Sequence, residues 1–239
     1  MRPLRCLLSA LLLVALAGAA VPHAATALRA EDSTRSITVA NGTLDDGDPR
    51  DVAAIRREIR TRESGTYIAE MLAGRDSALA RWADRGDTPI RVWVGAAPRI
   101  PQWTAGHAGQ VYAAFREWNA VGLPVRFAFV ADSADAEVHV TWTERFDEPI
   151  SGRTRWARNN GWWITDAVIT LAVHHHQGIV LDQDAVRAMA LHEIGHLLGL
   201  DHTANLGSVM ARRVRVRSVA AVDSATAQLL YSVPAGKLR

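Results

Sequence analysis

Three histidines and a glutamate are spaced so that they could hold and use a metal ion. His192 and His196 are four residues apart, so on a helix they lie one turn apart on the same face. Two imidazoles placed in this way can bind one ion, and Zn²⁺ is the usual metal for such ligands. Glu193 follows His192 and could act on water at the metal without being a ligand. The spacing therefore predicts a metal site on a helix.

A glycine and a third histidine follow within a few residues. Gly199 allows the chain to leave the helix through a left-handed residue, and the chain could then turn back to bring in His202 as a third ligand. Three protein ligands leave a fourth position for water, which distinguishes a catalytic zinc site from a structural one. The sequence predicts one catalytic Zn²⁺.

The stretch at 192–202, HEIGHLLGLDH, has the pattern H-E-x-x-H-x-x-G-x-x-H and resembles the metzincin metalloproteases, most of all their matrixin branch. That family has a methionine-bearing turn beneath the metal, and Met210 lies at a fitting distance downstream. The segment from Asp223 to Tyr231 is similar to the matrixin C-terminal helix, which carries an acidic residue followed by Q-x-L-Y.

The resemblance implies a zinc endopeptidase that acts on a protein or peptide substrate. In that reading, His192, His196 and His202 hold the zinc, and Glu193 takes a proton from the attacking water. Met210 packs beneath the ligands as an apolar floor. The family also implies that an extended substrate adds as a strand to the edge of the sheet.

Two other classes of protein fit part of this pattern. A secreted zinc protein could hold a peptide without cleaving it, although such a binder has no need of Glu193 as a base. A structural zinc domain would close the site with a fourth protein ligand, for which His174-His175-His176 is the nearest candidate. Glu193 and the open ligand set favour an enzyme.

A second metal site at the histidine triplet is not supported by its position in the sequence. Adjacent residues on a strand point to opposite faces, so at most two of the residues at 174–176 could converge without a bend. Matrixins carry calcium and a structural zinc on a His and Asp pattern that this sequence lacks. We expect a solvated strand end there.

The N-terminus has the composition of a secretory signal peptide. Arg2 and Arg5 precede an apolar run, and Ala25-Thr26-Ala27 is the favoured cleavage site, with Ala17-Gly18-Ala19 as the second choice. An uncleaved membrane anchor is the alternative, but the run is short for a span. Residues 1–27 therefore predict export, and the mature protein is expected to be secreted or periplasmic, monomeric and free of the membrane.

The mature chain has neither surplus charge nor cysteine. Removing residues 1–27 takes away two arginines and no acidic residue, so the formal charge of +2 falls to zero and gives no indication of nucleic-acid binding. The one cysteine, Cys6, is removed as well. The protein therefore has no disulfides and cannot keep itself latent with a thiolate on the zinc.

The rest of the chain predicts an N-terminal extension followed by one catalytic domain. Residues 28–88 form an extension or propeptide-like segment, with a polar linker at 28–50 and helical spacing of apolar residues at 51–62 and 67–83. Within 89–239, the alternation at 90–94 predicts a strand.

The remaining patterns complete an α+β catalytic domain. They predict a long amphipathic helix, three further strands and a short edge strand, followed by the helix that carries the histidines. The predicted ranges are 105–121, 125–130, 136–142, 162–173 and a short strand within 144–161. This order is similar to the zincin-like fold of the metzincins, with a mixed twisted sheet, an active-site helix and a C-terminal helix.

Overall fold

A mixed β-sheet forms one layer of the fold in the computed structural model, which describes residues 37–38, 51–75 and 77–238. The order of its strands is β1-β7-β8-β6-β4-β5, and β3 also pairs with β8. Only β7 and β8 are antiparallel, and the other pairs are parallel. The strands are β1 (Ile37–Thr38), β3 (Arg81–Trp82), β4 (Ile90–Val94), β5 (Phe127–Phe129), β6 (Val138–Thr143), β7 (Gly152–Arg158) and β8 (Trp163–Ala172).

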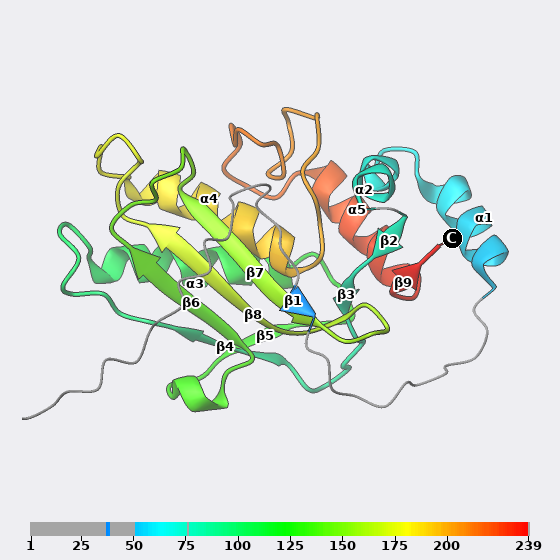
Figure 1. Cartoon of the computed structure of the whole chain (residues 1–239), viewed down its shortest axis with the longest axis horizontal. Helices are drawn as coiled ribbons and strands as arrows, with labels where there is room; N and C mark the ends of the chain where they lie inside the picture. Colours follow the sequence, from blue (N-terminus) through cyan, green and yellow to red (C-terminus); the bar gives the residue numbers. More distant parts are fainter. Residues whose placement is uncertain (1–36, 39–50, 76, 239) are drawn as a thin grey trace, which may run out of the picture. The chain divides into compact units, whose positions relative to one another are not determined.

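Two long helices pack against one face of this sheet (Figure 1). They are α3 (Ala105–Asn119) and α4 (Gln183–Leu197). A hydrogen bond from Trp118 Nε1 in α3 to the carbonyl of Leu191 in α4, 2.9 Å long, joins the two helices. The residues of β8 that face the helices, Ala167, Ile169 and Leu171, are at most 1% exposed. The sheet and the two helices thus enclose the main core.

The strand β7 lies near the edge of the sheet. Its only partner on the side away from β8, among the residues that the structure describes, is β1. That pairing is confined to Ala157 and Arg158, the last two residues of β7. The part of β7 from Gly152 to Trp156 therefore presents a free edge within the described chain.

The segment before β4 packs into the same core as the rest of the domain. It forms α1 (Val52–Arg62), α2 (Ile68–Gly74), β2 (Ala78–Leu79) and β3. Buried side chains of α2, β2 and β3 belong to the single large hydrophobic cluster, and they are Ile68, Met71, Leu79 and Trp82. The helix α2 contacts α5 (Ala221–Ser232), and β2 pairs with β9 (Gly236–Lys237), as Figure 1 shows.

The sequence prediction of one helix over 67–83 is wrong for its second half. The helix ends at Gly74, and Ser77 has a left-handed φ of 59°. The following residues form β2 and β3, which pair with β9 and β8. Pairing with distant strands has overridden the local helical spacing, as commonly happens for short apolar segments.

The other predicted elements lie where the sequence places them, and the predicted α+β class with a mixed sheet is confirmed. The expected signal peptide at 1–27 lies outside the described residues, and so does the linker at 28–50 apart from β1. No helix within the described part of the chain is long and apolar enough to cross a membrane.

Candidate metal centre

The helix α4 presents His192 and His196 from its buried C-terminal half. Its N-cap is Asp182, whose Oδ1 accepts a hydrogen bond of 2.7 Å from the backbone N–H of Ala185. This side chain satisfies one of the free N–H groups of the first turn. The residues from Met189 to Leu197 are all buried, so packing on both sides fixes the orientation of the two histidines.

The helix ends in a Schellman motif centred on Gly199. The N–H of Leu200 donates to the carbonyl of Gly195, and the N–H of Gly199 donates to the carbonyl of His196, each at 3.0 Å. Gly199 has a φ of +99°, a conformation that side chains other than glycine rarely adopt. The chain therefore reverses within a few residues and carries His202 back toward the helix.

The three histidines converge through their Nε2 atoms. The distances are 3.1 Å between His192 and His196, 3.2 Å between His192 and His202, and 3.3 Å between His196 and His202. Among the described residues, these three form the one cluster of His, Cys, Asp or Glu side chains that could hold a metal ion.

Hydrogen bonds to carbonyl groups fix which nitrogen carries the proton on two of these rings. His192 Nδ1 lies 2.6 Å from the carbonyl oxygen of Val209, and His196 Nδ1 lies 2.9 Å from that of Leu200. A carbonyl only accepts, so each Nδ1 must donate, and each neutral ring then presents an Nε2 lone pair. Two lone pairs 3.1 Å apart repel each other, so this contact is not a hydrogen bond and suits a shared cation.

Burial keeps these imidazoles neutral. It lowers the pKa of His192 to about 4, partly opposed by the hydrogen bond to Val209. It also holds the pKa of His196 well below its ordinary value, and the neighbouring His192 and His202 act in the same direction. Neutral imidazole is the form that binds metal ions.

The donor set and its spacing fit Zn²⁺. Ligand nitrogens around a tetrahedral zinc with Zn–N of about 2.1 Å lie roughly 3.4 Å apart, close to the separations found here. The carbonyl groups of Val209 and Leu200 hold two of the rings, as partners of metal-binding histidines usually do.

Glu193 is held by the sheet strand β7. Its side chain is only 5% exposed, and its Oε2 accepts a hydrogen bond of 2.6 Å from the hydroxyl of Thr154. A Cβ at Gly152 would lie 2.5 Å from Oε1 of Glu193, so the glycine provides space for the carboxyl group. Burial raises the pKa of Glu193 to about 7, opposed by the Thr154 hydrogen bond. Sequence reasoning did not identify either Gly152 or Thr154, because no local pattern marks them.

Met210 lies against α4 at Gly195, the residue before His196. It is fully buried, and a Cβ at Gly195 would lie 2.2 Å from its sulfur, so the methionine packs directly on the backbone of the helix. The turn before it is anchored by Asp223 of α5. This carboxylate accepts hydrogen bonds from the hydroxyl of Ser208 and, at 3.0 Å, from the N–H of Val209.

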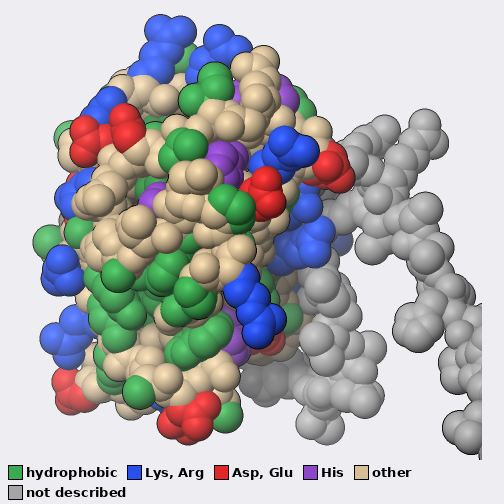
Figure 2. Space-filling model, turned by 90° about the vertical axis from the view of Figure 1, so that its left-hand side faces the viewer, with side chains coloured by type: hydrophobic (Ala, Val, Ile, Leu, Met, Phe, Trp, Pro, Cys, Tyr) green, Lys and Arg blue, Asp and Glu red, His purple; other side chains and the backbone are tan. Residues whose placement is uncertain are grey.

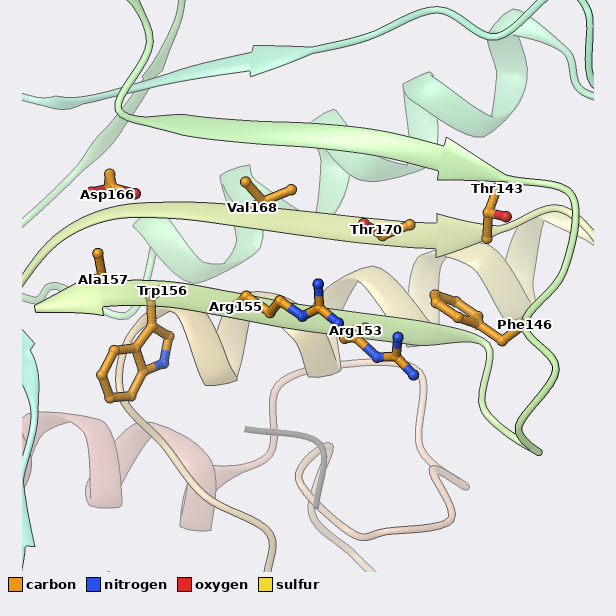
Figure 3. Close-up of a pocket in the computed structure, with 9 residues that line it drawn as sticks. All are labelled: Thr143, Phe146, Arg153, Arg155, Trp156, Ala157, Asp166, Val168 and Thr170. Carbon is orange, nitrogen blue, oxygen red and sulfur yellow. The ribbon is translucent and has the colours of Figure 1, made fainter. Parts of the chain in front are cut away.

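A pocket of about 480 Å³ lies along β7, on the face of the strand that points away from α4. Figure 3 shows Arg153 and Arg155 projecting from β7 with a helix behind the strand. Side chains alternate along a strand, so Thr154 faces α4 whereas Arg153 and Arg155 face away from it. The residues that line this pocket include neither Glu193 nor any of the three histidines.

The triplet at 174–176 is not part of the histidine cluster, and the prediction of a solvated strand end is wrong for His174, which is buried. His174 contacts Gln102 Oε1 through Nε2 at 2.8 Å and the carbonyl of Glu144 through Nδ1 at 3.3 Å. His175 and His176 lie beside each other, with 3.2 Å between Nε2 of the first and Nδ1 of the second. Figure 2 shows histidine side chains at the surface of one face of the molecule, some of them beside Lys or Arg side chains. The described residues include no three-ligand cluster at this place.

Comparisons with known proteins identify the family. The Matrixin (peptidase M10) model matches residues 101–232 of the 239, which include all three histidines, Glu193 and Met210. A solved structure with a similar chain is the crystal structure of myroilysin, with 12% sequence identity and a TM-score of 0.46, covering 64% of this chain and 86% of that chain. A search of curated proteins gave no match. Because the matched region spans more than half of the sequence, the chain belongs to the matrixin family of zinc metallopeptidases.

Proposed function

We propose that this protein is a secreted zinc endopeptidase in which His192, His196 and His202 hold the metal and Glu193 is the general base. The observation that carries the proposal is the convergence of three Nε2 atoms within 3.3 Å of one another, beside a buried carboxylate on the same helix. The family membership supports the peptidase reaction.

The chemistry that Zn²⁺ supplies in such a site is that of a Lewis acid, which polarises a carbonyl group and acidifies water. The protein contributes three imidazoles, and the carbonyl groups of Val209 and Leu200 together with the helix fix the orientation of those of His192 and His196. Glu193 would accept a proton at its carboxylate from the attacking water and return it to the departing amine. The hydroxyl of Thr154 donates to Oε2 of this carboxylate, so Oε1 is the oxygen that it leaves free for the proton.

The substrate proposed here is an extended peptide segment. The free edge of β7 from Gly152 to Trp156 offers backbone groups for strand addition, and the side chain of Thr154 in the same stretch contacts Glu193. Backbone recognition of this kind places a peptide bond near the metal centre with little demand on side chains. Secretion is part of the proposal because of the signal-like residues 1–27, and export would bring the enzyme to extracellular or periplasmic proteins.

The proposal is tested by metal content and proteolysis of the same preparations. Purified protein is loaded with zinc, and cleavage of an unfolded protein is followed for the parent chain and for Glu193→Gln, which preserves size. We expect about one zinc per chain in both proteins and cleavage by the parent only. Zinc without cleavage in the parent would show a binding protein instead, and cleavage by the variant would show that Glu193 is not the base.

A further inference from the structure

The loop that carries the third histidine is held from a part of the chain outside the family match. His202 lies beyond α4 in a segment without regular secondary structure, whereas His192 and His196 are fixed by the helix. The residues that contact this loop from α2 and its surroundings precede residue 101, where the family match begins. The position of His202 therefore depends on contacts that the family pattern does not contain.

Arg75 holds the loop on the N-terminal side of His202. Its guanidinium group donates to the carbonyl of Gly199 at 3.1 Å and more weakly to that of Leu200 at 3.5 Å. It also forms an ion pair with the carboxylate of Asp201, and the two side chains are only 13% and 19% exposed. One planar group with several donors thus binds three consecutive residues, which a lysine could not do in the same way.

Glu70 holds the loop on the other side of His202. Its Oε1 accepts from the hydroxyl of Thr203 at 3.1 Å, and its Oε2 accepts from the N–H of Ala204 at 2.9 Å. Both oxygens are used as acceptors, and a side chain of similar size without polar hydrogen-bonding groups, such as methionine, would lose both contacts. Arg75 and Glu70 are five residues apart at α2. They therefore bind the loop immediately before and immediately after His202.

The backbone that follows α2 supports the same loop from beneath. A Cβ at Gly199 would lie 2.1 Å from the carbonyl oxygen of Ala80, so the two segments are in close contact. Trp82 Nε1 donates to the carbonyl of Leu197 at 3.0 Å, which satisfies a free carbonyl group in the last turn of α4. The segment from α2 to β3 therefore contacts the C-terminal end of α4 and the residues that follow it.

We propose that Arg75 and Glu70 are positioning residues for His202, and that the segment from α2 to β3 is an integral part of the metal centre. The inference rests on the proposed function in that His202 is taken as a zinc ligand. The two side chains bring no ligand of their own. They limit the conformations of the loop, so His202 reaches the metal without a further entropic cost.

The test compares Arg75→Met and Glu70→Met with Arg60→Met, a matched control on α1 that removes an exposed arginine. Zinc affinity is measured by competition with a chelator, and the visible absorption of the Co²⁺-substituted protein reports the ligand geometry. We expect each of the two variants to bind zinc about 10-fold or more weakly, with an altered Co²⁺ spectrum. The control should match the parent, and Arg75→Lys should recover part of the affinity through its ion pair with Asp201.

Equal zinc affinity and an unchanged Co²⁺ spectrum in Arg75→Met, Glu70→Met and Arg60→Met would overturn the inference. If Arg75→Met does not fold, the result for Glu70→Met decides, because Glu70 is an exposed residue. A parent protein that binds zinc but cleaves nothing would contradict the proposed peptidase while leaving the affinity comparison valid. The two failures are therefore distinguishable.

Discussion

The hydroxyl of Thr154 lies 2.6 Å from Oε2 of Glu193, so a strand near the edge of the sheet holds the carboxylate of the active-site helix. The same hydroxyl lies 3.0 Å from the backbone carbonyl of Glu193. Thr154 is fully buried, and water cannot replace it. The strand that would bind the substrate and the helix that would supply the base are thus connected by one side chain.

Replacing Thr154 with valine should slow catalysis without loss of zinc. Valine has nearly the same shape but no hydroxyl group, and a hydrogen bond to a charged group contributes about 1.5–3 kcal/mol, equivalent to roughly 10- to 150-fold in rate. We expect kcat to fall within that range while KM changes little. Thr154→Ser is the control and should retain most of the activity. A valine variant as active as the parent would show that the contact does not orient Glu193.

Gly199→Ala should destabilise the protein more than Gly195→Ala. Alanine at 199 would take a left-handed φ at a cost of about 1–2 kcal/mol, and its Cβ would also meet the backbone oxygen of Ala80. The Cβ at 195 meets the sulfur of the buried Met210, whose side chain can change its rotamer more readily than the backbone of Ala80 can move. Urea unfolding of the zinc-free proteins measures the difference, and equal losses of stability would contradict this ranking.

Stability should decrease at high pH partly because of Tyr67. Burial raises the pKa of its phenol well above the ordinary value, and the carboxylate of Asp223 adds to the effect. The folded protein therefore holds the proton more tightly than the unfolded chain, whose tyrosine titrates near pH 10. This contribution to the free energy of unfolding is complete below about pH 10 and is lost as the pH rises further.

The control for this pH dependence is Tyr67→Phe. The variant lacks the titrating group, so its free energy of unfolding should fall less steeply between neutral pH and pH 11. Denaturant unfolding at a series of pH values measures both slopes. An identical slope in parent and variant would show that Tyr67 does not carry the effect.

A chain that begins at Asp51 should keep its fold and its zinc affinity, whereas a chain that begins at Pro89 should lose both. The shorter chain lacks Trp82, which is fully buried and donates to the carbonyl of Leu197. It also lacks Arg75 and Glu70. Circular dichroism and chelator competition on the two truncated proteins measure the outcome. A folded chain from Pro89 with parental zinc affinity would show that residues 51–88 are a removable extension.

The chemistry of the centre could be predicted because it depends on short spacings. Four residues separate His192 from His196 on one helix, and a glycine placed beyond them allows the reversal that brings in His202. The strand β4 could be predicted for a similar reason, since the fully buried Ile90 and Val92 flank the exposed Arg91.

The supporting residues could not be predicted because they act across large separations in the sequence. Thr154 and Glu193 are 39 residues apart, and Arg75 and Leu200 are 125 apart. A buried threonine or an arginine after a short helix has no local pattern that indicates its partner. The strands β2 and β3 are two residues long, so they show no period, and their pairing with β9 and β8 decides their conformation.

Zinc-dependent proteolysis with Glu193 as the base is best tested by following cleavage of an unfolded protein by the zinc-loaded parent and by Glu193→Gln, with the metal content of both measured on the same samples. We expect about one zinc per chain in each protein, with cleavage by the parent alone and its loss when a chelator removes the metal. Cleavage that persists in Glu193→Gln, or that continues without bound zinc, would contradict this mechanism.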